Sequence, residues 1–545
     1  MAKKEILVLS LIILLAFGLR LVALGQYPAG FTADEAAQGY TAYSILKTGK
    51  DEWGVNFPLN PRSFGDYKLP LQTYLMIPSI AIFGLNEWAV RLPNAILGSL
   101  GVLGIYLLVK ELFANSVHPK GVHSDTLRVS LGLFSSFLLA ISPWHISLSR
   151  GAFEANLTTF FLPMGMYWFL RGLRESKYLP LGSIFFGFNL FSYHAARLVT
   201  PLLGVVLVVW GRERMIRVIG KRRGRREIIL GGVIFGLFLV LAFYSTLIGG
   251  GTRAADIGIF SAGLKAPKIF IDNYLSYLSP QFFFTQGAGE ATYGMIPGRG
   301  VLYLFELPFL VFAFMSLAKK WDKRFSPILA WILLAPIPAA LSLGVGYHAN
   351  RVAVMMPAIQ TLSAYGGILL WERVKEGLEG RISHIVQLLY CLIVILSFLA
   401  FLKTYFFIAP KITAPVVAYG WKETMAYLAG IEDDYQKIIV SRKFSEPQAF
   451  VAFYKKWEPE DFQKQTKDWL RYEKESLKFV DQLGKYNLGK YEFRNIDFSK
   501  DKDLRKTLLV GKPEEFPADT SVQKMIVYPD GERAFWIVET KEDKR

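Results

Sequence analysis

Two adjacent acids early in the chain, Asp34 and Glu35, have side chains that could carry out acid–base chemistry. In a functional interpretation, one carboxylate accepts a proton and the other orients it or supports the loop. A pair of neighbouring acids can also be no more than a solvated turn, and spacing alone does not separate the two interpretations. Both residues are therefore candidate catalytic residues.

Four further segments carry candidate residues. Lys68 lies in GDYKLPL (65–71), where a lysine can also snorkel to lipid headgroups. Glu154 lies in SRGAFEAN, where an acid can also cap the helix that follows. Two similar segments, SYHAAR (192–197) and GYHANR (346–351), supply the candidates Tyr193, His194, Arg197, His348 and Arg351. An arginine at the outer end of a helix can anchor that helix at the membrane interface, or it can bind a phosphate.

Other classes of chemistry find little support in the sequence. It contains no P-loop, no GxSxG and no HExxH motif. Its single cysteine, Cys391, allows neither an internal disulfide nor a cysteine-based metal site. Two outer acids could hold a divalent metal ion, but the sequence does not require one. The net charge of +17 is concentrated in short loops between apolar runs, which argues against a nucleic-acid partner.

The elements that must position these residues are membrane-spanning helices. The chain has 545 residues, 52% of them hydrophobic, and these gather in blocks such as 228–243 and 386–401. Runs of about 18 or more apolar residues span a bilayer, so we predict an all-α polytopic protein with about eleven transmembrane helices. They are expected at 6–24, 91–112, 129–142, 157–170, 179–192, 199–210, 228–248, 301–318, 326–343, 352–371 and 385–408. The first is interpreted as a retained helix rather than a cleaved signal peptide.

The charge of the connecting loops predicts the orientation of these helices. Basic segments at 171–174, 212–226, 319–324 and 373–381 fall on one side, which the positive-inside rule makes cytoplasmic. The N-terminus is then inside, and all candidate residues face outward from the plasma membrane. Residues 69–83 are apolar but contain Pro78, and a full span there would reverse every later loop. We therefore predict a helix in the outer interface.

A change of composition near residue 409 predicts two domains. Residues 1–408 form the transmembrane catalytic domain, and residues 409–545 form a soluble α/β domain outside the membrane whose role the sequence does not indicate. Its expected strands are 437–440, 507–510 and 534–538, its helices lie near 421–430 and 459–472, and Asp530-Gly531 is a hairpin turn.

Taken together, the segments resemble the GT-C superfamily of lipid-linked-sugar glycosyltransferases. The resemblance is to the bacterial branch similar to protein O-mannosyltransferases, which also resembles the enzymes that add aminoarabinose to lipid A. It covers about residues 1–370. The segments that carry it are DEA, YKLPLQTYL, NEWAVRLPNAILGSLGVLGIYLLVKELF, SPWHISLSRGAFEAN, NYLSYLSPQFFF, LYLFELPF and YHANRVAVMMPAI.

The resemblance implies a polyprenyl-phosphate-sugar donor, inverting transfer and an active site on the outer face. It implies that Asp34 is the base and Glu35 its neighbour, and that Glu154 takes the acidic position of a second loop, where Asp is also common. Lys68 corresponds to the lysine of a KPP-like motif, although Leu69 replaces the first proline. The C-terminal domain lies outside the resemblance.

The chemistry of such a donor agrees with these residue types. A phosphate leaves as an anion, so the reaction needs a base for the acceptor hydroxyl but no strong general acid, unlike glycoside hydrolysis. Cations that hold the phosphate, such as Lys68 and Arg351, are the useful partners. We expect Tyr193, His194, Arg197 and His348 to contribute to substrate binding. The acceptor can be a protein, a glycolipid or a polysaccharide, and the sequence does not name the sugar.

Two other interpretations were weighed. A lipid-linked-sugar transporter or flippase would carry ionisable residues deep within its spans, whereas the acids here lie in loops on one side. A scaffold that displays the C-terminal domain would not need acids and bases in several outer loops. Among enzymes, the alternative is an oligosaccharide transferase or ligase that uses a larger lipid-linked donor.

The predicted orientation can be tested by labelling introduced cysteines from outside with a membrane-impermeant maleimide. We expect the Asp66→Cys variant to react and the Arg222→Cys variant to stay unlabelled, because basic loops are retained on the cytoplasmic side. Efficient labelling of the Arg222→Cys variant, with none of the Asp66→Cys variant, would show that the topology is wrong.

Overall fold

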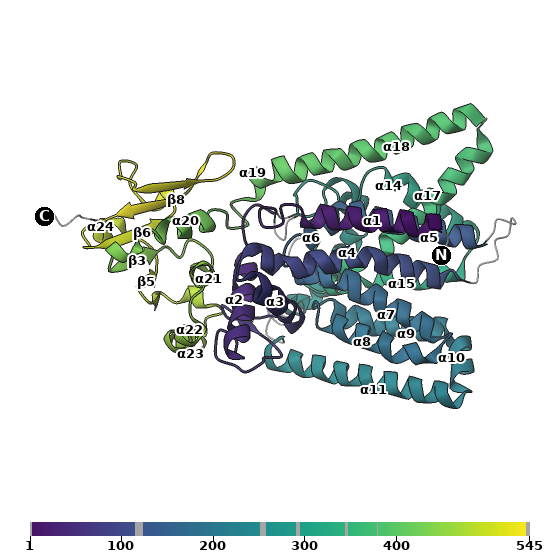
Figure 1. Cartoon of the computed structure of the whole chain (residues 1–545), viewed down its shortest axis with the longest axis horizontal. Coiled ribbons are helices and arrows are strands. Elements are labelled where there is room, and N and C mark those ends of the chain that lie inside the picture. Colours follow the sequence, from purple (N-terminus) through teal and green to yellow (C-terminus); the bar gives the residue numbers. More distant parts are fainter. Residues whose placement is uncertain are drawn as a thin grey trace. The chain divides into compact units, whose positions relative to one another are not determined.

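The computed structural model describes residues 3–114, 124–250, 258–289, 291, 295–343, 347–378 and 380–540 (Figure 1). The chain folds as two compact units. The first, which we call the helical unit, comprises residues 1–22 and 94–405. The second, the sheet unit, comprises residues 23–93 and 406–545. The division falls within helix α4 (Glu87–Leu112), after Pro93.

Helices make up most of the helical unit. In some of them, such as residues 179–190 and 380–403, apolar side chains are spread around the whole circumference, as is typical of helices surrounded by protein or lipid. In chain order they are α1 (Lys3–Leu21), α5 (Ser124–Ile141), α6 (Pro143–Ser149), α7 (Thr158–Gly172), α8 (Leu179–Leu190), α9 (Ala196–Trp210), α10 (Arg212–Ile219), α11 (Arg222–Ser245), α13 (Ala266–Tyr277), α14 (Glu306–Lys319), α15 (Ser326–Leu334), α16 (Ile337–Ala340), α17 (Ala358–Gly377) and α18 (Gly380–Lys403).

Three helical segments in the described part of the chain are long and apolar enough to cross a membrane: 87–112, 222–249 and 380–413. A fourth span results if the bent pair 127–141 and 143–149, which meet at 59°, is counted as one. Much of the apolar surface of α11 and α18 is exposed, and Figure 1 shows both at the edge of the helical unit. The other expected spans correspond to shorter helices, so the number eleven stays a prediction.

Close helix packing in the helical unit depends on small residues. Helices α14 and α17 lie side by side. Gly366 of α17 faces α14 so closely that an added Cβ would lie 1.7 Å from the backbone oxygen of Phe309. A glycine is therefore required at this position, because any side chain would push the two helices apart.

The N-terminal part of the sheet unit forms α2 (Ala33–Thr48), a two-residue hairpin of β1 (Arg62–Ser63) and β2 (Asp66–Tyr67), and α3 (Pro70–Phe83). Pro70 stands in the first turn of α3, where its missing N–H would have no helical partner. Helix α3 agrees with the predicted helix at 69–83, and it packs against α2. Its position in a membrane interface stays a prediction.

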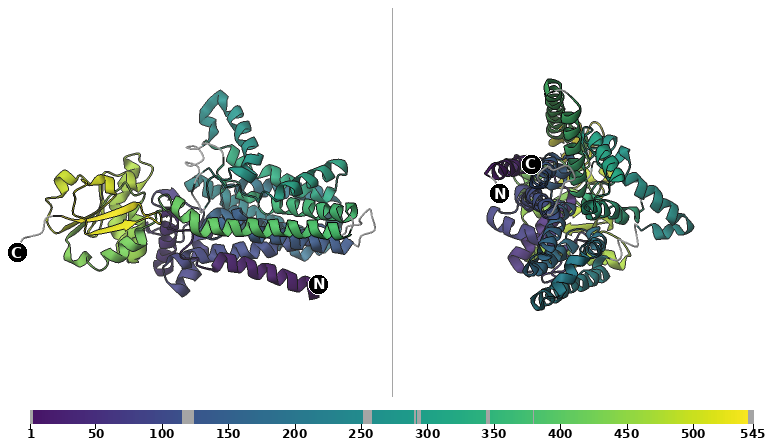
Figure 2. Two further views of the ribbon diagram at one scale, coloured as in Figure 1. Left: turned by 90° about the horizontal axis from the view of Figure 1, so that it is seen from above. Right: turned by 90° about the vertical axis from the view of Figure 1, so that its right-hand side faces the viewer.

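The C-terminal part contains a six-stranded mixed sheet of order β4-β5-β3-β6-β8-β7. Strand β3 is parallel to β5 and β6, and the other pairs are antiparallel. Figure 2 shows the strands in yellow and green with helices beside them. The strands are β3 (Lys437–Val440), β4 (Tyr486–Leu488), β5 (Tyr491–Phe493), β6 (Thr507–Gly511), β7 (Lys524–Val527) and β8 (Arg533–Glu539), and the helices are α19 (Ala409–Thr413), α20 (Trp421–Leu428), α21 (Pro447–Lys455), α22 (Pro459–Gln465), α23 (Arg471–Lys474) and α24 (Phe498–Asp501).

The structure differs from the sequence expectations in three places. Residues 33–48, taken as part of an outer loop, form α2. The predicted helix 326–343 is divided into α15 and α16 at Pro336, whose ring clashes with the preceding turn and which has no N–H to donate. Residues 23–93, assigned by sequence to the membrane domain, group with the C-terminal residues in the sheet unit. The three predicted strands are present, and Asp530-Gly531 connects β7 to β8 as expected, with Gly531 at φ +93°.

The contact at Gly366 leads to a test of helix packing. We expect Gly366→Ala to destabilise the protein by about 1–3 kcal/mol, the usual effect of overpacking. The measurement is the thermal midpoint in detergent. The control is Gly236→Ala in α11, where an added Cβ meets no described atom within 4 Å and the midpoint should not fall. Equal midpoints for the two variants would contradict the packing described for α14 and α17.

Candidate active site

Asp34 stands at the beginning of α2, where a capping box fixes the backbone. The Thr32 hydroxyl accepts a hydrogen bond from the Glu35 N–H at 3.2 Å, and the Thr32 N–H donates to the Glu35 carboxylate at 3.0 Å. This reciprocal pair satisfies two donors that a helix end leaves unpaired. Asp34 lies in the first helical turn, where the positive end of the helix dipole favours a carboxylate.

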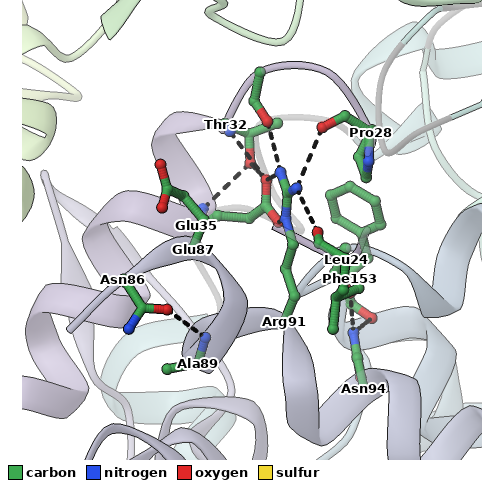
Figure 3. Close-up of polar contacts among 12 residues, drawn as sticks. Leu24, Pro28, Thr32, Glu35, Asn86, Glu87, Ala89, Arg91, Asn94 and Phe153 are labelled. Atoms are coloured by element: carbon green, nitrogen blue, oxygen red, sulfur yellow. Dashed lines mark hydrogen bonds and ion pairs between the residues drawn. The ribbon is translucent and has the colours of Figure 1, made fainter. Parts of the chain in front are cut away.

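Glu35 points into the protein and forms a fully buried ion pair. Its carboxylate accepts hydrogen bonds from Arg91 of α4 at 2.8 and 3.2 Å, and neither side chain is exposed. Arg91 also donates to the backbone oxygens of Leu24, Pro28 and Gly30, at 3.2, 3.2 and 2.6 Å (Figure 3). Glu35 is thus held by structural contacts that tie the loop before α2 to α4.

Lys68, another predicted site residue of the sheet unit, lies in contact with Asp34. Its ammonium lies 2.7 Å from Asp34 Oδ1 and 2.8 Å from Asp66 Oδ2. The Lys68 side chain is 6% exposed, whereas that of Asp34 is 28% exposed. The ammonium also lies 5.4 Å from the centre of the Phe64 ring. The lysine is therefore largely withdrawn from solvent, while the aspartate remains accessible to another molecule.

Asp66 is a member of this cluster that the sequence analysis did not select. It lies on β2, two residues before Lys68, and successive residues of an extended strand alternate between its two faces. The spacing Asp-x-Lys in an extended segment was the available signal. Two carboxylates, those of Asp34 and Asp66, share the Lys68 ammonium, which is a cation able to bind an anionic group.

Such a cluster has the parts of a general base and an anion site. Asp34 can accept a proton from a hydroxyl group at its exposed side. Lys68 can donate hydrogen bonds to an anion if it releases one carboxylate. Asp66 can keep the lysine in place while this happens, since its hydrogen bond to the ammonium does not depend on Asp34.

The other predicted site residues belong to the helical unit. Glu154 begins a short helical segment, Glu154–Leu157, and attracts the Arg197 guanidinium electrostatically. Arg197 donates to the hydroxyls of Ser245 at 2.6 Å and Thr246 at 2.7 Å, which ties the start of α9 to the end of α11. These hydrogen bonds anchor the helix, and the binding role of Arg197 stays a prediction.

The two segments that carry a Tyr-His pair, 192–197 and 346–351, contact each other in the helical unit. The Asn350 amide donates to the Tyr193 hydroxyl at 3.5 Å, and the Tyr193 ring lies beside that of His194. Arg351 donates to the Ser342 hydroxyl at 2.7 Å and to the Leu343 oxygen at 3.4 Å. The backbone N–H of His348 donates to the Tyr277 hydroxyl at 3.3 Å. Their roles in substrate binding stay predictions.

A pocket of about 500 Å³ lies elsewhere in the sheet unit. Aromatic side chains of Tyr27, Phe31, Trp421 and Tyr454 line it together with Lys422 and other residues, and neither Asp34 nor Lys68 does. Its mixed lining is typical of small-molecule sites. Within the described residues, no group of three or more His, Cys, Asp or Glu side chains is placed to hold a metal ion.

The buried pair leads to a stability prediction. Arg91→Met should destabilise the protein by about 3–5 kcal/mol, because it leaves Glu35 as an unpaired buried charge. The exposed pair of Lys500 and Asp497, 2.8 Å apart with side chains 81% and 48% exposed, provides the control. Lys500→Met should change stability by less than about 1 kcal/mol. The measurement is the thermal midpoint of unfolding of each variant. An equal fall in the midpoint for both variants would contradict the structural role of Arg91.

Part of the chain is similar to known mannosyltransferase sequences. Residues 68–245, less than half of the chain, match the family described as dolichyl-phosphate-mannose-protein mannosyltransferase. A putative mannosyltransferase, YkcB of Bacillus subtilis, is 29% identical over 126 residues. That match spans 22% of this chain and 16% of the relative, so it covers a small part of the relative's length.

Solved structures of other proteins share the fold of this chain. ArnT from Cupriavidus metallidurans in the apo state is 11% identical, with a TM-score of 0.53 over 98% of this chain and 97% of that one. The oligosaccharyltransferase AglB from Archaeoglobus fulgidus, in complex with an inhibitory peptide and a dolichol-phosphate, is 12% identical, with a TM-score of 0.50 over 100% of this chain and 75% of that one. The chain is therefore similar over residues 68–245 to a mannosyltransferase family, and it shares its fold with ArnT and AglB.

Proposed function

We propose that the protein transfers a sugar from a polyprenyl-phosphate-linked donor to an acceptor hydroxyl, with inversion, at the outer face of the plasma membrane. The observation that carries the proposal is the contact of 2.7 Å between Lys68 and the accessible Asp34, in a chain that shares its fold with ArnT and AglB. A base and a phosphate-binding cation are the two groups that this reaction needs most.

Lys68 is the group proposed to hold the phosphate of the donor. Related structures support a lipid-phosphate ligand: ArnT from Cupriavidus metallidurans, 12% identical and with a TM-score of 0.50 over 98% of each chain, has been solved bound to undecaprenyl phosphate. A lysine that is 6% exposed is poorly solvated, so it interacts strongly with an anion that displaces one of its carboxylates.

Asp34 is the proposed base for the acceptor. The acceptor oxygen attacks the anomeric carbon, the carbon–oxygen bond to the phosphate breaks, and its electron pair leaves with the phosphate oxygen. The acceptor proton passes to the Asp34 carboxylate and then to solvent. Neutral Asp34 attracts the Lys68 ammonium less, and Asp66, 2.8 Å away, keeps that ammonium in position for the developing phosphate charge.

Glu154 and Arg351 keep their proposed roles as the second acid and a second phosphate-binding cation, and Tyr193, His194, Arg197 and His348 remain proposed substrate-binding residues. The acceptor can be a protein, a glycolipid or a polysaccharide. Transfer of a larger oligosaccharide is the alternative, and the similarity of fold to AglB favours it. Both alternatives use the same lipid phosphate and the same base.

Asp34→Asn tests the proposal. The substitution keeps the size of the side chain but removes its basicity, so sugar transfer should slow by about 10²–10⁴-fold while the protein folds and still binds the lipid phosphate. The measurement is turnover with polyprenyl-phosphate-sugar donors by purified protein in lipid. Asp433→Asn, at a side chain that is 99% exposed, is the control and should retain normal turnover. Near-normal turnover by Asp34→Asn would remove Asp34 from the mechanism and leave Glu154 as the next candidate.

A further inference from the structure

We propose that the pocket of about 500 Å³ in the sheet unit binds a neutral saccharide, as a site for the sugar units of a carbohydrate acceptor that do not themselves react. The inference rests on the proposed function, since it takes Asp34 as the base that meets the reacting hydroxyl. It selects a carbohydrate-bearing acceptor from the classes that the sequence leaves open. Asp34 and Lys68 lie outside the lining of this pocket, which is therefore a second site within the same unit.

Two segments of the sheet unit, 25–31 and 406–423, form most of the pocket walls. They pack directly against each other. Gly30, at φ +103°, lies so close to the second segment that an added Cβ would be 2.4 Å from the Val417 oxygen. A side chain at this position would push the two walls apart. The pocket is therefore formed by fixed backbone contacts, as is usual for small-molecule sites, and its volume is within their range of about 300–1,000 Å³.

Buried aromatic rings make one part of the lining rigid. Phe31 and Trp421 both line the pocket, and each is 2% exposed. The Phe31 ring packs against that of Phe453 with the centroids 4.7 Å apart. Trp421 stacks on Phe450 at 4.8 Å, with the two planes 8° apart. Because these rings are held from behind by other rings, the lining keeps its shape without a ligand.

Other aromatic rings of the lining remain accessible. Tyr27 and Tyr419 are half-buried, and Phe407 is 71% exposed. The Tyr27 ring meets that of Phe406 edge-on, with the centroids 5.0 Å apart, which fixes its orientation. The C–H groups of a sugar ring carry a small positive charge and pack well on the negative face of an aromatic ring. Accessible tyrosine rings thus suit the apolar face of a saccharide.

Glu87, at the beginning of α4, gives the pocket an oriented hydrogen-bond acceptor. Its side chain is 10% exposed. The carboxylate accepts a hydrogen bond from the Tyr454 hydroxyl at 3.1 Å and pairs with the Lys422 ammonium at 3.2 Å. All three residues line the pocket. A carboxylate has about four acceptor positions, so the Glu87 group can also accept a hydrogen bond from a ligand hydroxyl.

The charges of the lining favour a neutral ligand. Two acids, Glu87 and Glu423, and two lysines, Lys411 and Lys422, line the pocket together. A phosphate would meet the carboxylates, and an ammonium group would meet the lysines, so an ion of either sign is opposed. Sugar hydroxyls both donate and accept hydrogen bonds and can satisfy both kinds of side chain. Aromatic faces and balanced charges together indicate a saccharide.

The pocket wall belongs to the structure that positions Asp34. Arg91 donates to the Gly30 oxygen, in the wall, at 2.6 Å. The same guanidinium pairs with Glu35, the residue after Asp34. Glu87 lies one helical turn before Arg91 on α4 (Figure 3). The saccharide site and the proposed base therefore share one loop and one helix, which suits an acceptor bound at several sugar units.

The test measures saccharide binding by saturation-transfer difference NMR with the purified protein in nanodiscs. The probes are the neutral saccharides maltotriose, mannotriose and chitotriose. We expect a signal from the C–H protons of at least one of them at concentrations up to the millimolar range. Glu87→Gln should weaken its binding about tenfold, because a hydrogen bond to a neutral acceptor is weaker than one to a carboxylate. Tyr419→Ala should weaken it about 3–10-fold through loss of the ring.

Tyr427→Ala is the matched control. It removes a half-buried tyrosine of the same unit that lies outside the pocket lining, and it should bind the saccharide as the wild-type protein does. No signal from any probe, or equal affinity in all three variants, would overturn the inference. So would a signal from a peptide of serine and threonine alone, which would indicate a protein acceptor.

The binding measurement also separates this inference from the proposed function. Turnover of a polyprenyl-phosphate-sugar donor by a protein that binds none of the saccharides would overturn the inference and leave the proposed function intact. Saccharide binding that Glu87→Gln and Tyr419→Ala weaken, in a protein that does not turn over such donors, would support the pocket and overturn the proposed function.

Discussion

The buried ion pair of Glu35 and Arg91 is the constraint on which the candidate site depends. Neither side chain is exposed, and the guanidinium also holds three backbone oxygens of the loop before α2. Charges this deeply buried are stable only when they are paired and their hydrogen bonds are satisfied. The pair therefore admits one arrangement of the loop, the helix start and α4. That arrangement places Asp34, the residue just before Glu35, at an accessible position beside Lys68.

The two neighbouring acids illustrate how environment separates residues of the same type. Glu35 turns inward and is used for structure, while Asp34 is 28% exposed and shares the Lys68 ammonium with Asp66. The sheet unit combines this segment with the C-terminal helices and sheet, so Asp34 and Lys68 lie in one compact unit with the C-terminal part of the chain despite the distance in sequence.

Much of this organisation could be predicted from the sequence, and the rest could not for physical reasons. Apolar runs predict helices such as α11 and α18 because their composition alone requires burial or lipid. The resemblance selected Asp34 and Lys68, which the structure brings into contact. The pattern Thr32-x-x-Glu35 is a local capping-box signal for the start of α2. The pairing of Glu35 with Arg91 and the contact of Asp34 with Lys68 depend on long-range packing, which no local pattern encodes. The roles of Glu154 and Arg351 stay predictions.

The central claim is that the Asp34–Lys68 cluster is the reaction centre, and the location of a bound lipid phosphate tests it most directly. The measurement is a cryo-electron microscopy structure of the protein with undecaprenyl phosphate in nanodiscs. The account predicts phosphate oxygens within hydrogen-bond distance of the Lys68 ammonium, with Asp66 still bound to the lysine. A phosphate held instead in the pocket beside Lys411 and Lys422, with Lys68 still bridging both aspartates, would contradict it.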